Sequence, residues 1–448
     1  MKNELFKLAE SAKEKIEKLP KKTVVRVVSH YDADGITSAA IICKSLYRKG
    51  YKFHVTLMKN PFKKGLERLK RENGKMAIFC DMGSGQIDRI AKLDYENIII
   101  CDHHQPMKDV EKDSRIIEIN AHLCGINGSF EASGSTITFA VARNLDEKNL
   151  DLLPLAITGA IGDKQHLGGF KGYNKELFEL GLKTNFIEEK REWFSSRNKI
   201  NEDLYYSIEP YYRGLSGRKD EIGKYLKKLG ISDCIFDKLD DKKKIVLKSS
   251  LILQLIKNEC DPKVIDNILA PKYFSQSLGY NLDDFAELLD ACGKSGEKGI
   301  GLLIALGNKN LIEKAEGIRK KFKQRILDGL IKLEKSENIF ELDALQYFFA
   351  DDPSLGGIIG GIAINYFLRN DKPILSLTEM DDELHISARG NHLLVEKGLD
   401  LGLAMKEGAR IVGGIGGGHN IAAGATIPKK EKDIFLQKVD EIVKEQLI

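Results

Sequence analysis

The first third of the chain alternates short apolar runs with helical patterns, and this alternation limits the fold more than any other feature. The apolar runs are TVVRVV (23–28), KFHVTL (52–57), MAIFC (76–80), NIIIC (97–101) and RIIEI (115–119). Helical patterns occupy residues 36–48, 62–72 and 84–92. Continuous β-branched runs separated by helices are typical of a buried parallel sheet with helices on both faces. The sequence therefore predicts a parallel α/β domain over residues 1–169.

The rest of the chain divides into a charged middle and a second α/β segment. Residues 170–340 contain few strand candidates and predict a helical middle or connector region. From residue 344 the α/β pattern returns, with ALQYFFA, a glycine-rich helix (GGIIGGIAINYFLRN), the strands PILSLTE and ELHISAR, a glycine segment over 413–425 and a closing helix over 429–447. We therefore expect a smaller C-terminal α/β domain over residues 341–448, joined to the first domain by the helical region.

Composition narrows the class of protein. At 448 residues the chain is long enough for two packed domains and a connector. No apolar run approaches the roughly 20 residues that span a bilayer. The predicted first helix, residues 1–19, is charged throughout, which does not fit a signal peptide. The seven cysteines form no CxxC pair, so neither a disulfide framework nor a zinc knuckle is indicated. We expect a cytoplasmic protein without a membrane partner.

Acidic residues and histidines follow the predicted elements at four places. These places are SHYDADG (29–35), CDMG with Asp81, CDHH with Asp102, His103 and His104, and GAIGD with Asp163. Ligands of open α/β sheets bind at the carboxyl ends of the strands. If the three strands concerned lie side by side, all four groups meet at one edge of the sheet. A single Asp after a strand is usually a helix cap or a turn residue, but four such groups favour a functional site.

The first of these groups has a regular spacing. Alternate side chains of an extended segment share a face, so His30, Asp32 and Asp34 are expected to point together. Gly35 then permits the turn into a helix that starts near Ile36.

The predicted site carries more negative charge than a buried position tolerates. The carboxylates are those of Asp32, Asp34, Asp81 and Asp163. Carboxylates a few ångströms apart repel one another strongly once water is partly excluded. Two divalent cations would neutralise four carboxylates, and the histidines add imidazole ligands. A mixed oxygen and imidazole set favours Mn²⁺, with Mg²⁺ and Co²⁺ as alternatives.

The four motifs resemble those of the DHH phosphoesterase superfamily, which is named for its Asp-His-His. HYDADG, the lone Asp of CDMG, CDHH and GAIGD agree with the family in order and spacing. The segment GGIGGGHNIAAGA (413–425) resembles the glycine- and histidine-rich motif of the DHH-associated C-terminal domain. A structural turn is the alternative interpretation of this segment alone. Neither resemblance extends to residues 170–340.

The resemblance implies a role for each matching residue. His30 and Asp32 would hold one metal ion, Asp34, His103 and Asp163 a second, and Asp81 would bridge the two. Asp102 would orient neighbouring ligands, and His104 would face the scissile phosphate or the attacking water. In the C-terminal domain, the residues implied to bind a phosphate or a terminal nucleotide are Arg389, Gly416, Gly417, Gly418 and His419.

Within the superfamily the chain is most similar to archaeal RecJ-like exonucleases, in its length and in the GSGQ that follows the lone Asp. The resemblance implies a metal-dependent phosphodiesterase acting on the ends of single-stranded DNA or RNA, with a role in replication or repair and a GINS or replisome partner. The net charge of +4 predicts that nucleic acid is bound by a local basic groove. A small-substrate phosphodiesterase, acting on oligoribonucleotides, cyclic dinucleotides or nucleotide phosphates, is one alternative. A non-catalytic replisome scaffold is another.

Overall fold

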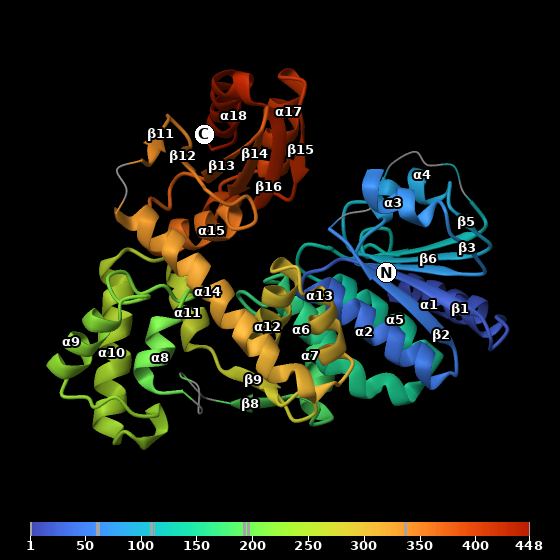
Figure 1. Cartoon of the computed structure of the whole chain (residues 1–448), viewed down its shortest axis with the longest axis horizontal. Coiled ribbons are helices and arrows are strands. Elements are labelled where there is room, and N and C mark those ends of the chain that lie inside the picture. Colours follow the sequence, from blue (N-terminus) through green and yellow to red (C-terminus); the bar gives the residue numbers. More distant parts are fainter. Residues whose placement is uncertain are drawn as a thin grey trace. The chain divides into compact units, whose positions relative to one another are not determined.

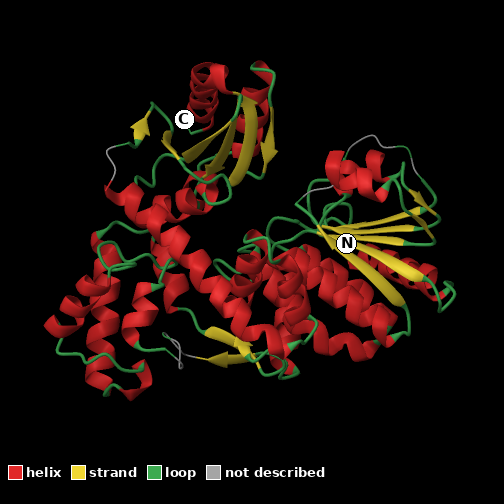
Figure 2. Ribbon diagram, viewed as in Figure 1, coloured by secondary structure: helices red, strands yellow, loops and turns green. Residues whose placement is uncertain are grey.

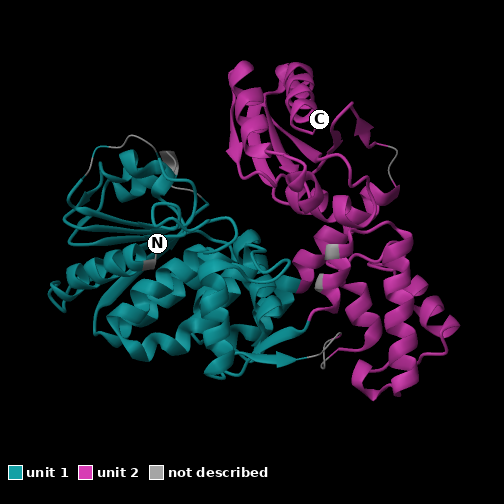
Figure 3. Ribbon diagram, turned by 180° about the vertical axis from the view of Figure 1, so that it is seen from behind, with its two compact units in different colours: residues 1–191, 271–319 teal, residues 192–270, 320–448 magenta. Residues whose placement is uncertain are grey.

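The computed structural model describes residues 2–59, 63–107, 111, 113–190, 194, 198–335 and 338–447. Its internal contacts group into two compact units, each built from two stretches of chain (Figure 3). Unit 1 comprises residues 1–191 and 271–319, and unit 2 comprises residues 192–270 and 320–448. The predicted middle region thus contributes residues to both units.

Unit 1 contains the predicted parallel sheet. Its five strands run in the order β2-β1-β4-β6-β7, and every neighbouring pair is parallel (Figures 1 and 2). The strands are β1 (Val24–Ser29), β2 (Lys52–Leu57), β4 (Ala77–Cys80), β6 (Ile98–Asp102) and β7 (Ile116–Asn120). β1, β4 and β6 form here because their β-branched and aromatic side chains are buried on both sides of the sheet, whereas the edge strands β2 and β7 are only partly buried.

Helices cover both faces of this sheet. Val25 and Val27 of β1 belong to one core cluster, whereas Val28 belongs to another. The first cluster includes residues of α1 (Lys2–Glu17), α2 (Ala33–Arg48), α5 (Gly134–Leu145), α6 (Leu153–Gly162) and α7 (Gly172–Lys183). The second includes residues of α3 (Lys63–Leu69) and α4 (Ile87–Ile90). The short strands β3 (Asn73–Gly74) and β5 (Asp94–Tyr95) pair with each other.

The chain leaves unit 1 and returns to it through one antiparallel pair of strands. β8 (Glu188–Lys190) pairs with β9 (Lys272–Ser275), and β9 pairs with β10 (Tyr280–Asn281). Lys190 and Lys272 are register partners, so the intervening residues are inserted where a hairpin turn would lie. Unit 1 then continues through α12 (Leu282–Lys294), α13 (Lys298–Ala305) and the start of α14 (Ile312–Lys335).

Unit 2 combines helices with a six-stranded mixed sheet in the order β11-β12-β13-β14-β16-β15. The strands are β11 (Phe340–Glu341), β12 (Gln346–Phe349), β13 (Ile374–Met380), β14 (Glu383–Arg389), β15 (Ile415–Gly418) and β16 (Ala422–Pro428). Its helices are α8 (Ile200–Tyr205), α9 (Lys219–Lys228), α10 (Asp241–Lys257), α11 (Pro262–Leu269), the remainder of α14, α15 (Gly356–Tyr366), α16 (His392–Glu396), α17 (Leu401–Ile411) and α18 (Lys432–Gln446). β12 and β13 pair in parallel, whereas the neighbours β11-β12, β13-β14, β14-β16 and β16-β15 pair antiparallel.

The predicted fold class is confirmed: an N-terminal parallel sheet, a smaller C-terminal sheet and a mainly helical middle. Two local predictions are wrong, and one group of strands was missed. The helix expected near Ile36 starts at Ala33, because Asp32 caps it. The helix expected over 84–92 is a 3₁₀ turn followed by the single turn of α4. Strands β8 to β10 were not expected. No helix in the described ranges is long and apolar enough to cross a membrane.

Candidate metal centre

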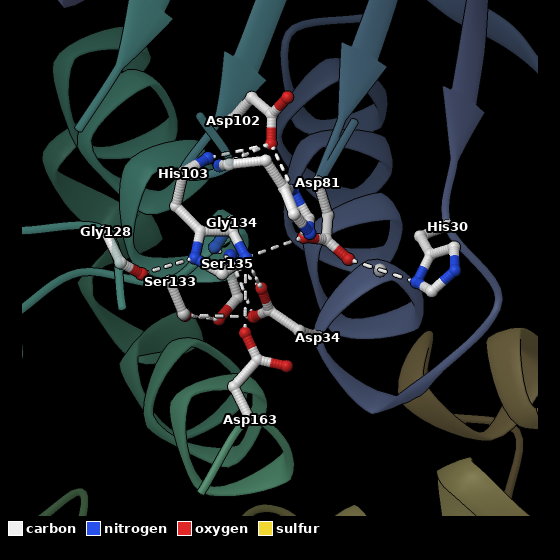
Figure 4. A network of polar contacts seen from close by, with 12 residues as sticks. His30, Asp34, Asp81, Asp102, His103, Gly128, Ser133, Gly134, Ser135 and Asp163 are labelled. Atoms are coloured by element: carbon white, nitrogen blue, oxygen red, sulfur yellow. Dashed lines mark hydrogen bonds and ion pairs between the residues drawn. The ribbon is translucent and has the colours of Figure 1, made fainter. Parts of the chain in front are cut away.

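Three neighbouring strands bring the predicted residues to one edge of the sheet. β1, β4 and β6 are adjacent, and their carboxyl ends carry His30, Asp81 and Asp102 (Figure 4). His103 lies at the centre of the group. Its Nε2 is 3.2 Å from Asp81 Oδ1, 3.2 Å from Asp163 Oδ2 and 3.9 Å from Asp34 Oδ2. The condition on which the predicted convergence depended is therefore met.

The residues form overlapping sets that could hold a metal ion. The sets are His30, Asp32 and Asp81; Asp34, His103 and Asp163; and Asp81, His103 and His104. Within each set the ligand atoms lie within 4.8 Å of one another. Asp81 belongs to two sets, and its two oxygens face different partners: Oδ2 is 3.5 Å from His30, and Oδ1 is 3.2 Å from His103.

Asp32 and Asp34 reach the site by different routes, which corrects the expectation of one extended segment. Asp32 is the N-cap of α2, and its Oδ1 accepts the N–H of Gly35 at 3.0 Å. Its other oxygen is 2.8 Å from His30 Nδ1. Asp34 lies inside the first turn of the helix and is fully buried. A helical turn, and not strand alternation, thus directs its side chain to the centre.

The start of α5 holds Asp34 in place. The Asp34 carboxylate accepts the hydroxyl of Ser133 at 2.9 Å, the N–H of Gly134 at 2.6 Å and the N–H of Ser135 at 3.0 Å. Gly134 also packs closely against Asp81, since a Cβ added at Gly134 would lie 2.6 Å from Asp81 Cβ. Sequence reasoning missed this support. The Ser133–Thr136 capping box was a visible signal of a helix start, but nothing in it indicated a partner 100 residues away.

His103 is fixed in the tautomer that a metal ligand needs. Its Nδ1 is 2.6 Å from the carbonyl oxygen of Gly128, and because a carbonyl only accepts, Nδ1 carries the proton. Nε2 is then the ring nitrogen that faces the carboxylates and could bind an ion. The Gly128 carbonyl also accepts Gln165 Nε2 at 2.9 Å, and Asn174 Nδ2 donates to Gln165 Oε1 at 2.6 Å. Gln165 and Asn174 were likewise missed.

Asp102 acts as a brace for the two histidines. Its Oδ1 accepts the N–H of His103 at 2.8 Å and lies 2.8 Å from His104 Nδ1, while Oδ2 accepts the N–H of Ser84 at 2.9 Å. Burial opposes ionisation, but His104 and these N–H groups hold the pKa of Asp102 well below its usual range. Asn120 supports the same group of residues, because its side-chain amide donates to the Ser84 hydroxyl and to the His104 carbonyl.

The electrostatics indicate a site built for cations. Burial, together with the nearby Asp81, raises the pKa of Asp34 to about 7. Burial and the charge of Asp34 raise the pKa of Asp163 well above its usual range. Burial opposes the charged form of His103, yet Asp81 and Asp163 raise its pKa well above the usual value. Asp34 and Asp163 thus hold their protons more tightly than ordinary carboxyl groups do. This is expected of carboxylates that ionise fully only beside a metal.

Two buried ligand atoms make no hydrogen bond within the described part of the chain, namely Asp81 Oδ1 and His30 Nδ1. Each lies near an ionisable neighbour, but not in the geometry of a hydrogen bond. Buried polar atoms are rarely left in this condition unless an ion or water completes them. These donors, one carboxylate oxygen and one imidazole nitrogen, fit divalent ions such as Mn²⁺.

The C-terminal motif residues lie together in unit 2. Arg389, at the end of β14, is in register with Ala422 of β16, whose carbonyl accepts the N–H of His419. Gly417 and Gly418 have φ values of 155° and 146°, a region that favours glycine. An added Cβ at Gly357 of α15 would lie 2.6 Å from the Arg389 guanidinium, so the helix backbone packs directly on this side chain.

Comparison with known proteins agrees with both halves of this description. The DHH family, N-terminal domain, matches residues 24–160, and the DHHA1 domain matches residues 348–445. An uncharacterized protein of Methanocaldococcus jannaschii is 35% identical over 463 residues, which cover 99% of this chain and 98% of the relative.

Solved structures show the same fold. RecJ from Thermus thermophilus, solved in complex with Mn²⁺, matches with a TM-score of 0.61 at 17% identity, over 98% of this chain but only 55% of RecJ. This chain therefore spans about half the length of that protein. CDC45 from Entamoeba histolytica matches with a TM-score of 0.65 at 12% identity, over 99% of both chains. The chain belongs to the DHH phosphoesterase superfamily and has a RecJ-like fold.

Proposed function

We propose that this chain is a metal-dependent phosphodiesterase that removes nucleotides from the ends of single-stranded DNA or RNA. The observation that carries the proposal is the complete and convergent ligand set at the edge of the unit 1 sheet. The fold is shared by the exonuclease RecJ and by CDC45, so the fold alone does not separate catalysis from scaffolding. A scaffold does not require buried carboxylates arranged around unsatisfied ligand atoms, whereas a metal-dependent hydrolase does.

Each ligand has a role in the proposal. His30 and Asp32 would hold one divalent ion, with Mn²⁺ preferred and Mg²⁺ or Co²⁺ as alternatives. Asp34, His103 and Asp163 would hold a second ion, and Asp81 would serve both. When bound, paired ions make hydroxide available near neutral pH and stabilise charge on the phosphate.

The remaining residues position the substrate. His104 is kept in orientation by Asp102 and remains 44% exposed, so it can contact the scissile phosphate or orient the attacking water. Arg389, Gly416, Gly417, Gly418 and His419 bind a phosphate or the terminal nucleotide, with glycines that allow the backbone to approach closely. The resemblance to RecJ-like proteins adds a replisome component of the GINS type as a candidate partner.

The test is digestion of single-stranded DNA and RNA, labelled at either end, in Mn²⁺ and beside an Asp34→Ala variant. Label released as mononucleotide from one end, and absent with the variant, supports an exonuclease and reports its polarity and sugar preference. Long strands left intact while dinucleotides are consumed would replace this proposal with a small-substrate enzyme. If no substrate is cleaved in a metal-dependent way, the non-catalytic scaffold remains as the alternative.

A further inference from the structure

The loop that carries His30 and Asp32 is held by a distant part of the chain. The N–H of Ala33, the first residue of α2, donates to Asp290 Oδ1 at 2.7 Å. These residues are 257 positions apart in the sequence, yet both belong to unit 1. Asp290 lies near the end of α12, and Figure 4 shows the gold ribbon of the α12–α13 region on the His30 side of the site.

Asp290 is fixed in turn by a neighbour on its own helix. Lys294 Nζ is 2.6 Å from Asp290 Oδ2, one turn further along α12. The side chains are only 23% and 26% exposed, so the pair is held in a partly dehydrated position. The two carboxylate oxygens therefore have separate partners: one anchors the start of α2 and the other is anchored by Lys294.

The backbone of α12 also touches the loop directly. A Cβ added at Gly293 would lie 1.8 Å from the carbonyl oxygen of Tyr31, far inside the van der Waals contact distance. Tyr31 stands between His30 and Asp32 in the sequence, so any side chain at position 293 displaces the segment that bears both of them. Glycine is required at this point for close approach.

We infer that the end of α12 positions the His30–Asp32 loop, which makes Asp290 and Gly293 positioning residues of the metal centre. This inference rests on the proposed function, in which His30 and Asp32 hold an ion. The matched DHH region ends at residue 160, so the support comes from outside it. The catalytic site of this chain is then complete only with a helix that follows the inserted segment.

A glycine pair provides the first test. Gly293→Ala places a methyl group against the loop without touching a ligand, whereas Gly299→Ala, in α13, meets no atom within 4 Å. Titration with Mn²⁺ followed by electron paramagnetic resonance should show two sites in the wild-type protein. We expect Gly293→Ala to weaken one site by roughly 10- to 100-fold, as loss of ligand support does, and Gly299→Ala to leave both unchanged.

A carboxylate series provides the second test and does not depend on the glycine variant folding. Asp290→Ala removes the acceptor for Ala33 and should weaken the same Mn²⁺ site. Asp290→Asn keeps an oxygen acceptor and should retain most of the affinity. Asp284→Asn, which removes a carboxylate of the same helix facing Arg319, serves as the control. Thermal unfolding of each variant separates loop displacement from global destabilisation.

The outcomes distinguish the inference from the proposed function. A wild-type protein that binds no Mn²⁺ overturns the proposed function. Two wild-type sites, together with unchanged binding in both Gly293→Ala and Asp290→Ala, overturn the positioning role and leave the proposed function intact. If Asp290→Ala and Asp290→Asn lose the same Mn²⁺ affinity, the hydrogen bond from the N–H of Ala33 is not the contact through which Asp290 acts.

Discussion

At the scale of single residues, the buried carboxylate of Asp34 connects the fold to metal chemistry. It accepts three hydrogen bonds, yet burial and Asp81 still raise its pKa to about 7. Hydrogen bonds from neutral donors therefore do not offset the neighbouring negative charge. An ion that binds here must displace the proton, so metal affinity and pH are linked.

Mn²⁺ affinity should consequently depend on pH in one direction. Below about 7 Asp34 holds a proton that the ion must displace, and affinity should fall by roughly tenfold per pH unit for each proton displaced. Above about 7 the contribution of Asp34 should level off, whereas His103, whose pKa is also raised, should still have a proton to lose. Isothermal titration with Mn²⁺ in a series of buffers measures it, and an affinity that stays constant from about pH 6 to about pH 8 would contradict the assignment of Asp34 as a ligand.

The Ser133 hydroxyl should matter for metal binding although it is no ligand. Ser133→Ala removes one of the three donors to Asp34 and should lower Mn²⁺ affinity by roughly 10- to 100-fold. Ser129→Ala is the control, because the contact of that residue uses its backbone N–H and not its hydroxyl. Equal affinities for the two variants would show that the N–H groups of Gly134 and Ser135 suffice.

At the scale of elements, helix α6 shows how the site overrides local preference. An Ala in place of Gly inside a helix usually stabilises it by about 1 kcal/mol. At Gly159 of α6, however, the added Cβ would lie 2.3 Å from Asp34 Oδ1 and 2.2 Å from Ser135 Oγ. The helix packs so closely against the site that only a residue without a side chain fits.

Two glycine substitutions should therefore change stability in opposite directions. Gly159→Ala should lower the free energy of unfolding and impair Mn²⁺ binding, because the methyl group displaces Asp34. Gly317→Ala in α14 should raise the free energy of unfolding by about 1 kcal/mol, because no atom lies within 4 Å of the added Cβ. Denaturant unfolding of both variants measures the difference. A stabilised Gly159→Ala protein would mean that α6 can move away from the site at little cost.

The elements also show what the sequence allowed us to predict. The five main strands of unit 1 were predicted because buried parallel strands require long β-branched runs, such as that of β6. β8 was missed because its three residues, Glu188–Lys190, have no apolar pattern and depend on pairing with β9. The start of α2 was misplaced because Asp32 was interpreted as part of an extended segment, not as a helix cap.

The residues of the candidate site also divide into those that the sequence allowed us to predict and those that it did not. Histidines and aspartates at strand ends were recognisable because few structural tasks need that combination. Ser133, Gln165 and Asp290 were not, because serine, glutamine and aspartate are common at caps and surfaces. Their importance comes from partners 99, 37 and 257 residues away, which no local pattern encodes.

At the scale of the whole molecule, unit 1 is interrupted by the inserted segment between β8 and β9. Because Lys190 and Lys272 are register partners, a two-residue turn can connect them. A fragment of residues 1–190 joined through Asn-Gly to residues 272–319 contains α12 and α13, whose apolar residues belong to the main core cluster of unit 1.

We expect this joined fragment to unfold in a single transition and to bind Mn²⁺ with the stoichiometry of the full chain. A fragment of residues 1–190 alone should expose the surfaces of α2 and α6 that α12 covers, and should aggregate or lose metal affinity. Thermal unfolding and Mn²⁺ titration of the two fragments make the comparison. Identical behaviour would show that the returning segment is dispensable for unit 1.

The contact between Ala33 and Asp290 also has a consequence for synthesis in the cell. A ribosome that adds roughly 5 to 20 residues per second needs about 10 to 50 seconds to cover the 257 positions between them. During that interval the nascent sheet carries its aspartates and histidines at an edge whose loop has not yet been secured. The His30–Asp32 loop therefore gains its hydrogen bond to Asp290 only after translation has passed α12.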